Sequence, residues 1–236
     1  MAEVIQRFTP FLNYLIELQA SWPVLELEKL VGEAGGPEHV ACITVDMVRG
    51  FCSEGPLASP RIQGVVPAVA RILARAHELG VRDFLFPQDS HPPDSPEFHA
   101  FPPHCVEGSS QAQTVPELSG LPFAQHFKHF PKRSLSSHHG TGLHEHLIAR
   151  HRTRMIAMGD CSDLCLYLLA LELRLWANVK HLPWEVVVPA SAVQTYDLPV
   201  EMARGLGAMP HDGELLHLVF LYHLQLNGVR VVADLT

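Results

Sequence analysis

A proline-rich segment, QDSHPPDSPEFHAFPPHC (residues 88–105), gathers acidic, imidazole and thiol side chains in a short stretch. Imidazole nitrogen together with carboxylate oxygen suits zinc, iron(II), manganese or nickel better than calcium or magnesium. Prolines restrict the segment to few conformations, so ordering it around an ion costs less entropy. This composition predicts a metal site, although a polar surface loop is the alternative in a chain with 16 histidines. The first candidates for ligands are Asp89, His91, Glu97 and His104, and the further candidates are Asp94, His99 and Cys105.

A second reactive segment, MGDCSDLCLYLLALELRL, begins at Met158 and contains two cysteines. Its apolar periodicity predicts a helix with Cys165 in the first turn and Cys161 in the turn before it. Backbone N–H groups and the helix dipole at such a position favour a thiolate, which is a nucleophile. A thiol nucleophile also needs a base or cation nearby, and Asp46 and Lys132 are the candidates. The alternative is that both cysteines are small buried hydrophobic residues, as most free cysteines are.

The elements that must position these residues alternate between strand and helix after residue 39. Strands are expected at 39–47, 81–89, 123–132, 154–160, 184–191 and 229–235, and helices at 61–80, 140–151, 162–178, 200–209 and 213–228. This alternation predicts an α/β fold, a three-layer αβα Rossmann-like arrangement around a mostly parallel sheet of about six strands. Ligands of such sheets bind beyond the carboxyl ends of the strands. Asp46, Asp89, Lys132 and the two cysteines all follow strand ends, so we expect them to converge at one edge.

The N-terminal segment differs from the rest of the chain. Residues 1–18 have the pattern of an amphipathic helix and lack the basic region and small-residue cleavage site of a signal peptide. The segment EAGGPEH (residues 33–39) reads as a linker. We therefore expect an N-terminal helical extension over residues 1–36 and one domain over residues 37–236.

Composition narrows the class of protein. The chain has 236 residues, a net charge of −8 and a pI near 6.0, which argues against a nucleic-acid-binding protein. Its apolar runs fall short of the roughly 18 residues that a membrane-spanning helix needs. The odd number of cysteines, five, fits reduced thiols in a cytoplasmic protein better than a disulfide framework.

Five segments carry a resemblance to a known family. The chain resembles the isochorismatase-like cysteine hydrolases, and among them it is most similar to the nicotinamidases. The resemblance runs from about His39 to Asp197. It rests on TVDMVRGFC (residues 44–52), DSHPPDSPEFHAFPPHC (residues 89–105), KRSLSSHHGTGL (residues 132–143), GDCSDLCLYLLALELR (residues 159–174) and VVVPASAVQTYD (residues 186–197).

The resemblance implies roles for particular residues. It implies a catalytic triad of Asp46, Lys132 and Cys165, which selects Lys132 over Lys128 and Cys165 over Cys161. It also implies an oxyanion hole made by the backbone N–H groups of Cys161 and Cys165, and a cis peptide bond before Cys161. The implied metal ligands are Asp89, His91, Glu97 and His104, which would hold one divalent ion, with zinc first and iron, manganese or nickel as alternatives. Phe51 and Phe101 are the candidates to sandwich the substrate ring.

The resemblance also implies an activity. The expected protein is a metal-dependent cysteine amidohydrolase that converts nicotinamide, or a similar small carboxamide, to the acid and ammonia through a Cys thioester. Relatives are often homo-oligomers, so we expect one here. The residues that follow Asp46 and Lys132 depart from the nicotinamidase pattern, and these departures concern the substrate more than the chemistry. The alternatives are hydrolysis of another small amide or of a vinyl ether, a silent small-molecule-binding or interaction domain of the same fold, and a structural metal protein.

Overall fold

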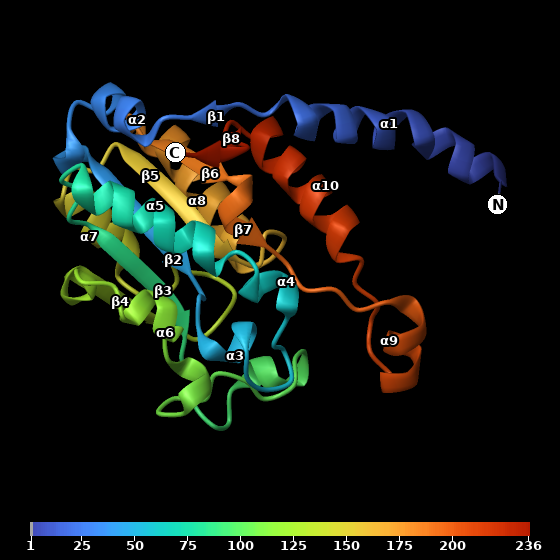
Figure 1. Cartoon of the computed structure of the whole chain (residues 1–236). Coiled ribbons are helices and arrows are strands. Elements are labelled where there is room, and N and C mark those ends of the chain that lie inside the picture. The colour runs from blue at the N-terminus through green and yellow to red at the C-terminus, as the bar shows by residue number, and fades with distance from the viewer. Residues whose placement is uncertain (1) are drawn as a thin grey trace.

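The computed structural model describes residues 2–236 and contains the expected parallel sheet (Figure 1). The strand order is β4-β3-β2-β5-β6-β8, and β7 also pairs with β5; every one of these pairs is parallel. The strands are β2 (Val40–Val45), β3 (Phe84–Asp89), β4 (Phe127–Lys132), β5 (Arg154–Asp160), β6 (Glu185–Pro189), β7 (Val193–Gln194) and β8 (Arg230–Val232). The three-layer α/β architecture predicted from the sequence is thereby confirmed.

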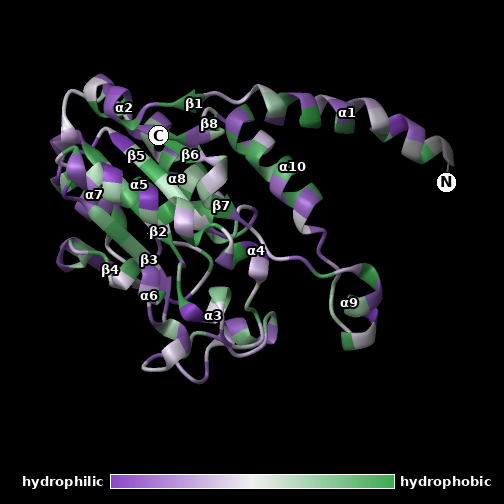
Figure 2. Ribbon diagram, in the orientation of Figure 1, coloured by the Kyte–Doolittle hydropathy of each residue, from purple (hydrophilic) through white to green (hydrophobic). Residues whose placement is uncertain are grey.

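Helices cover both faces of the sheet and enclose two hydrophobic clusters. One cluster contains apolar side chains of α2 (Leu27–Glu33), α5 (Val66–Glu78) and α6 (Pro116–Ser119). The other contains side chains of α7 (Leu143–Ala149), α8 (Cys165–Lys180) and α10 (Gly213–Leu226). Every residue of the central strands β2, β3 and β5 is buried, as the near-continuous apolar runs of a doubly covered sheet predict. In Figure 2 much of the length of these strands has the green of hydrophobic residues.

Two elements that the sequence predicts as continuous are each divided into two in the structure. The helix expected over 61–80 divides into α4 (Pro60–Gln63) and α5, because Pro67 occupies the first turn of a new helix, where its missing N–H costs nothing. The strand expected over 229–235 divides into β8 and β9 (Asp234–Leu235), which leaves the main sheet and pairs with β1 (Val24–Leu25). Two further short helices are α3 (Arg49–Cys52) and α9 (Val200–Leu206).

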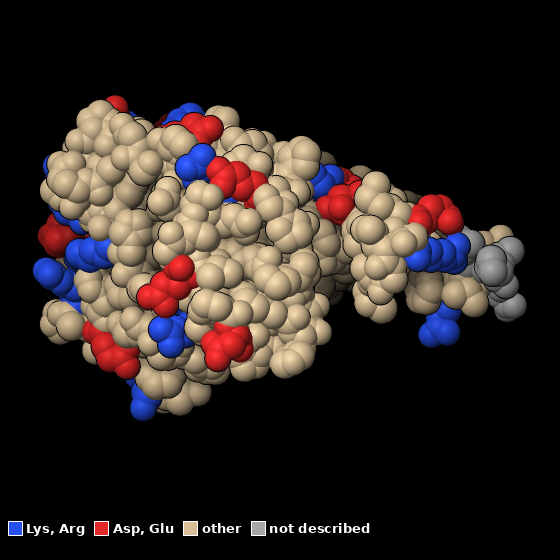
Figure 3. Space-filling view, turned by 90° about the horizontal axis from the view of Figure 1, so that it is seen from below, with Lys and Arg blue, Asp and Glu red and all other residues tan. Residues whose placement is uncertain are grey.

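The amphipathic helix expected at the N-terminus is α1 (Ala2–Ser21), and Met1 lies outside the described residues. It extends away from the body of the molecule and packs against α10, where Phe11 and Tyr14 contact the ring of Tyr222 (Figure 1). Within residues 2–236, no helix is both long enough and apolar enough to cross a bilayer. On the face in Figure 3, basic and acidic side chains are interspersed rather than grouped by sign.

Candidate active site

The residues singled out at the strand ends converge on one point. Asp46 directly follows β2, and Asp89 and Lys132 are the last residues of β3 and β4. Cys165 is the first residue of α8, as predicted. All four are nearly inaccessible to solvent, with at most 5% of any one exposed. The parallel sheet therefore brings two carboxylates, a cation and a thiol to the same buried region.

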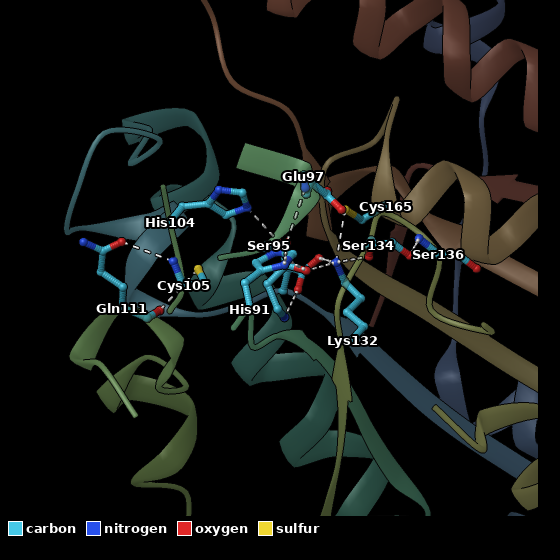
Figure 4. Close-up of polar contacts among 12 residues, drawn as sticks. His91, Ser95, Glu97, His104, Cys105, Gln111, Lys132, Ser134, Ser136 and Cys165 are labelled. Atoms are coloured by element: carbon cyan, nitrogen blue, oxygen red, sulfur yellow. Dashed lines mark hydrogen bonds and ion pairs between the residues drawn. The ribbon is translucent and has the colours of Figure 1, made fainter. Parts of the chain in front are cut away.

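Lys132 lies at the centre of this group. Its Nζ is 2.8 Å from Asp46 Oδ2, 2.5 Å from Asp89 Oδ1 and 3.5 Å from Cys165 Sγ. It also donates a hydrogen bond of 3.2 Å to the carbonyl oxygen of Ser134 (Figure 4). The second oxygen of Asp46 accepts a hydrogen bond of 2.8 Å from the backbone N–H of Asp89. One buried ammonium group thus joins two carboxylates to the thiol.

The charges of this group are set by burial and by each other. Burial, and then the charge of Asp89, raise the pKa of Asp46 to about 6, against the opposing effect of Lys132. Burial raises the pKa of Cys165 well above its ordinary value, and Lys132 acts in the opposite direction. Burial would lower the pKa of Lys132, but the carboxylates of Asp46 and Asp89 outweigh it and raise that pKa well above its usual range. Lys132 is therefore charged, and the Cys165 thiol needs a base to remove its proton.

The proline-rich loop brings two of its histidines to Asp89. His91 Nε2 lies 3.3 Å from Asp89 Oδ1, and His104 Nε2 lies 3.4 Å from Asp89 Oδ2. One donor atom from each of these three buried residues lies within 4.8 Å of the others. Figure 4 shows both imidazole rings directed toward the same point beside Lys132. The three residues form a compact set of nitrogen and oxygen donors of the kind that zinc and its neighbours bind.

The other ring nitrogens of both histidines are oriented by the loop. His104 Nδ1 lies 2.8 Å from the carbonyl oxygen of Pro102, and His91 Nδ1 lies 3.4 Å from Ser95 Oγ. Such contacts fix the ring of a metal-binding histidine and leave its second nitrogen free for the ion. In the described chain, His91 Nε2 is buried and forms no hydrogen bond, although Asp89 Oδ1 lies 3.3 Å away. These nitrogen and oxygen donors fit a divalent metal ion.

Glu97, the fourth expected ligand, lies near this set without joining it. It belongs to the 3₁₀ turn Pro96–His99 and is half-buried. Its Oε1 is buried and has no hydrogen-bond partner within residues 2–236, yet it falls outside the three-residue donor cluster. Burial, and then the charge of Asp89, raise its pKa. Of the further candidates, Asp94 and His99 are exposed and the Cys105 thiol points to the carbonyl of Gln111, 3.6 Å away.

The two expected aromatic residues flank the same loop. The ring centroids of Phe51 and Phe101 lie 5.5 Å and 6.2 Å from that of His104. Phe51 is buried and Phe101 is half-buried. Both rings are therefore beside the metal donors.

The loop from Cys161 to Cys165 connects β5 to α8. The Asp160–Cys161 peptide bond is cis, as expected. The carbonyl oxygen of Cys161 accepts hydrogen bonds of 3.1 Å from the N–H groups of Leu164 and Leu166. All five cysteines, each within the described chain, are free and buried.

A comparison with protein families decides the relationship that this geometry suggests. A family model of the isochorismatase domain matches residues 40–202, which is more than half of the chain. The chain belongs to the isochorismatase family. The matched residues include Asp46, the proline-rich loop, Lys132, Cys161 and Cys165.

Individual relatives of this isochorismatase-family protein include nicotinamidases. Nicotinamidase 1 of Arabidopsis thaliana is 28% identical, over 93% of this chain and 95% of its own length. The nicotinamidase/pyrazinamidase of Mycobacterium tuberculosis is 32% identical over 33% of this chain and 45% of its own. The likeness to a nicotinamidase thus extends over nearly the full length of both chains.

Solved structures show the same fold. The pyrazinamidase of Pyrococcus horikoshii in complex with zinc has a TM-score of 0.65 and 22% identity, over 82% of this chain and 98% of that one. The pyrazinamidase/nicotinamidase of Streptococcus mutans has a TM-score of 0.65 and 22% identity, over 82% and 99%. At these identities the likeness establishes the fold.

Sequence reasoning missed several polar residues beside the reactive group of this isochorismatase-family chain. Asp160 is 1% exposed, and neither of its carboxylate oxygens has a hydrogen-bond partner in the part of the chain described. Burial, and then the charge of Asp46, raise its pKa well above the ordinary value. The only signal was an acidic residue at the end of an otherwise apolar strand. His211 and His217, which bind the side chains of Asp163 and Ser162, were also missed because 48 and 55 residues separate the partners.

Proposed function

We propose that this protein is a metal-dependent cysteine amidohydrolase that acts on nicotinamide or a similar small aromatic carboxamide. The observation that carries the proposal is the position of Lys132, which contacts Asp46, Asp89 and Cys165 at once. Lys132 thus lies between the thiol and Asp89, which supports a substrate held at both. The family match and the full-length likeness to a plant nicotinamidase support it.

The chain's own residues carry the covalent chemistry. Asp46 takes the proton of Cys165 Sγ, and the thiolate, stabilised by Lys132, attacks the carboxamide carbon. The backbone N–H groups of Cys161 and Cys165 stabilise the oxyanion. The C–N bond then breaks, and Asp46 gives its proton to the leaving ammonia. Water next attacks the thioester while Asp46 takes its proton. The C–S bond breaks, the acid leaves and Cys165 regains the proton.

The metal would be held by Asp89, His91 and His104, with Glu97 as a fourth ligand. A divalent ion held there would supply a Lewis acid for the ring nitrogen of the substrate. The imidazole and carboxylate donors favour zinc, and a pyrazinamidase of the same fold was solved with zinc. Phe51 and Phe101 would contact the two faces of the aromatic ring.

A comparison of nicotinamide with benzamide tests the proposal, since benzamide keeps the ring and carboxamide but lacks the ring nitrogen. Zinc-loaded protein should release ammonia and nicotinic acid in equal amounts, with kcat/KM for benzamide lower by at least roughly 10-fold. Pyrazinamide, which keeps a ring nitrogen at the same position, is the positive control. Protein that binds zinc but releases no ammonia from either nicotinamide or pyrazinamide contradicts the proposed substrate class.

A further inference from the structure

Ser162 and Asp163, in the turn between β5 and α8, each contact the side chain of a histidine. Ser162 Oγ lies 2.9 Å from His217 Nδ1, and Asp163 Oδ2 lies 2.7 Å from His211 Nε2. Ser162 is fully buried, and no more than 8% of Asp163, His211 or His217 is exposed. A buried hydroxyl or carboxylate that loses its partner is costly, so these pairs restrict where the loop can lie.

Both histidines come from the C-terminal segment, beyond the residues that match the isochorismatase domain. His217 is one turn into α10, which packs on α8 and on α1. The segment is therefore attached directly to the loop that carries the thiol, and it does more than cover the sheet.

His211 is itself fixed from several directions. Its backbone exchanges hydrogen bonds of 2.7 Å and 2.8 Å with Leu198. Its Nδ1 lies 2.9 Å from the carbonyl oxygen of Tyr196, and the ring of Tyr196 stacks on it with centroids 3.8 Å apart. These contacts fix the orientation of the His211 ring. A fixed ring can in turn restrict the position of Asp163 and of the loop that carries it.

We propose that His211 and His217 are positioning residues of the reaction, which hold the loop from Cys161 to Cys165 so that the thiol stays beside Lys132 and the two backbone N–H groups stay aligned. The inference rests on the proposed function for its catalytic readout. It assigns a role in the active site to a segment that lies outside the family domain. A misplacement of about 1 Å at a reacting group can cost roughly 100-fold in rate, so small shifts of this loop are enough.

The first test compares two substitutions of one residue. His217→Leu removes the bond to Ser162, whereas His217→Asn can place an amide atom where Nδ1 lies. We expect His217→Leu to lower kcat for nicotinamide by roughly 10- to 100-fold with KM within about twofold, and His217→Asn to recover most of the loss. The matched control is His223→Leu on the same helix, since His223 is exposed and bonds Tyr167 of α8 rather than the loop. A folded His217→Leu protein with the wild-type kcat overturns the inference.

A second readout does not depend on the substrate. Iodoacetamide alkylates the Cys165 thiolate, and mass spectrometry of the Cys165 peptide gives the rate. We expect slower alkylation in His217→Leu and, should that variant fail to fold, in the milder Ser162→Ala. Wild-type rates in folded Ser162→Ala overturn the inference even if nicotinamide is hydrolysed. Slowed alkylation in a protein that releases no ammonia from nicotinamide supports the inference and refutes only the proposed substrate.

Discussion

Lys132 Nζ lies 2.5 Å from Asp89 Oδ1, and this contact joins the thiol group to the loop with the metal donors. The same carboxylate also faces two histidines, with His91 Nε2 3.3 Å from Oδ1 and His104 Nε2 3.4 Å from Oδ2. Burial raises the pKa of Asp89, but Lys132 and the two histidines outweigh it and hold that pKa well below its usual range. Asp89 is therefore a buried anion between the ammonium group of Lys132 and the proposed metal site.

Replacement of Lys132 should show that Asp89 interacts both with this lysine and with a bound metal ion. Lys132→Met leaves the carboxylates of Asp46 and Asp89 buried without their ammonium partner. In metal-free protein we expect the free energy of unfolding to fall by about 3–5 kcal/mol, because removal of one partner strands a buried charge. Zinc should restore part of that loss by supplying a cation to Asp89. Urea unfolding in EDTA and in zinc measures both values.

The control for that experiment is Lys128→Met, on the same strand, since Lys128 pairs with Asp83 rather than with the reactive group. Its loss of stability should be the same with and without zinc. Equal losses with and without zinc in Lys132→Met would show that Asp89 is not a metal ligand.

The proposed metal ligands should contribute unequally to the affinity for zinc. His104→Ala removes one donor of the compact set, and bound zinc should fall from about one ion per chain to near zero after dialysis. Glu97→Gln, outside that set, should weaken zinc binding by a smaller factor, about 10-fold. Metal analysis and competition with a chelator give both numbers. His99→Ala, an exposed histidine of the same loop, is the control and should bind zinc as the wild type does; full zinc content in His104→Ala would contradict the ligand set.

The acid stability of the fold should depend on Asp83. This carboxylate is 1% exposed and lies 2.6 Å from Lys128 Nζ, 2.7 Å from Arg152 Nε and 3.0 Å from His146 Nε2. Burial raises its pKa, but the hydrogen bonds from these three partners outweigh it and leave the pKa below 3.8. A depressed pKa in the folded state adds stability above the unfolded-state pKa, and this contribution is lost as pH falls through the folded-state value.

Asp83→Asn should therefore lower the free energy of unfolding by roughly 3 kcal/mol at pH 7. The difference from the wild type should shrink as the pH falls below about 3.8, where the unfolded wild type begins to take up the proton. Denaturant unfolding at pH 7, 5 and 3 measures the trend, with Asp94→Asn on the exposed loop as the control. A difference that stays constant down to pH 3 would show that Asp83 is not held as an anion.

Much of the reactive group could be predicted from the sequence because it depends on local patterns. Buried strands are recognisable as continuous apolar runs, and in a parallel sheet their last residues must share an edge. Asp46, Asp89 and Lys132 were found in this way, and Cys165 was placed by the periodicity of the helix that it starts. These positions follow from secondary structure and topology alone.

The rest depends on packing between distant elements. Nothing near Ser162 indicates that His217 will reach it, because the contact exists only once α10 lies against α8. Met47 and Val48, which depart from the nicotinamidase pattern, are fully buried core residues. The spacing of the loop also suggested Glu97 as an equal ligand, whereas the 3₁₀ turn that carries it leaves its carboxylate outside the compact donor set.

The thioester between Cys165 and a carboxamide can be tested by removal of the thiol. Ammonia release from nicotinamide should be measured for zinc-loaded wild-type protein and for Cys165→Ala with the same zinc content. We expect release by the wild type and a loss of more than about a thousandfold in the variant, with unchanged bound zinc and unfolding temperature. Hydrolysis by Cys165→Ala at a rate near that of the wild type would contradict it, because the reaction would then need no thiol.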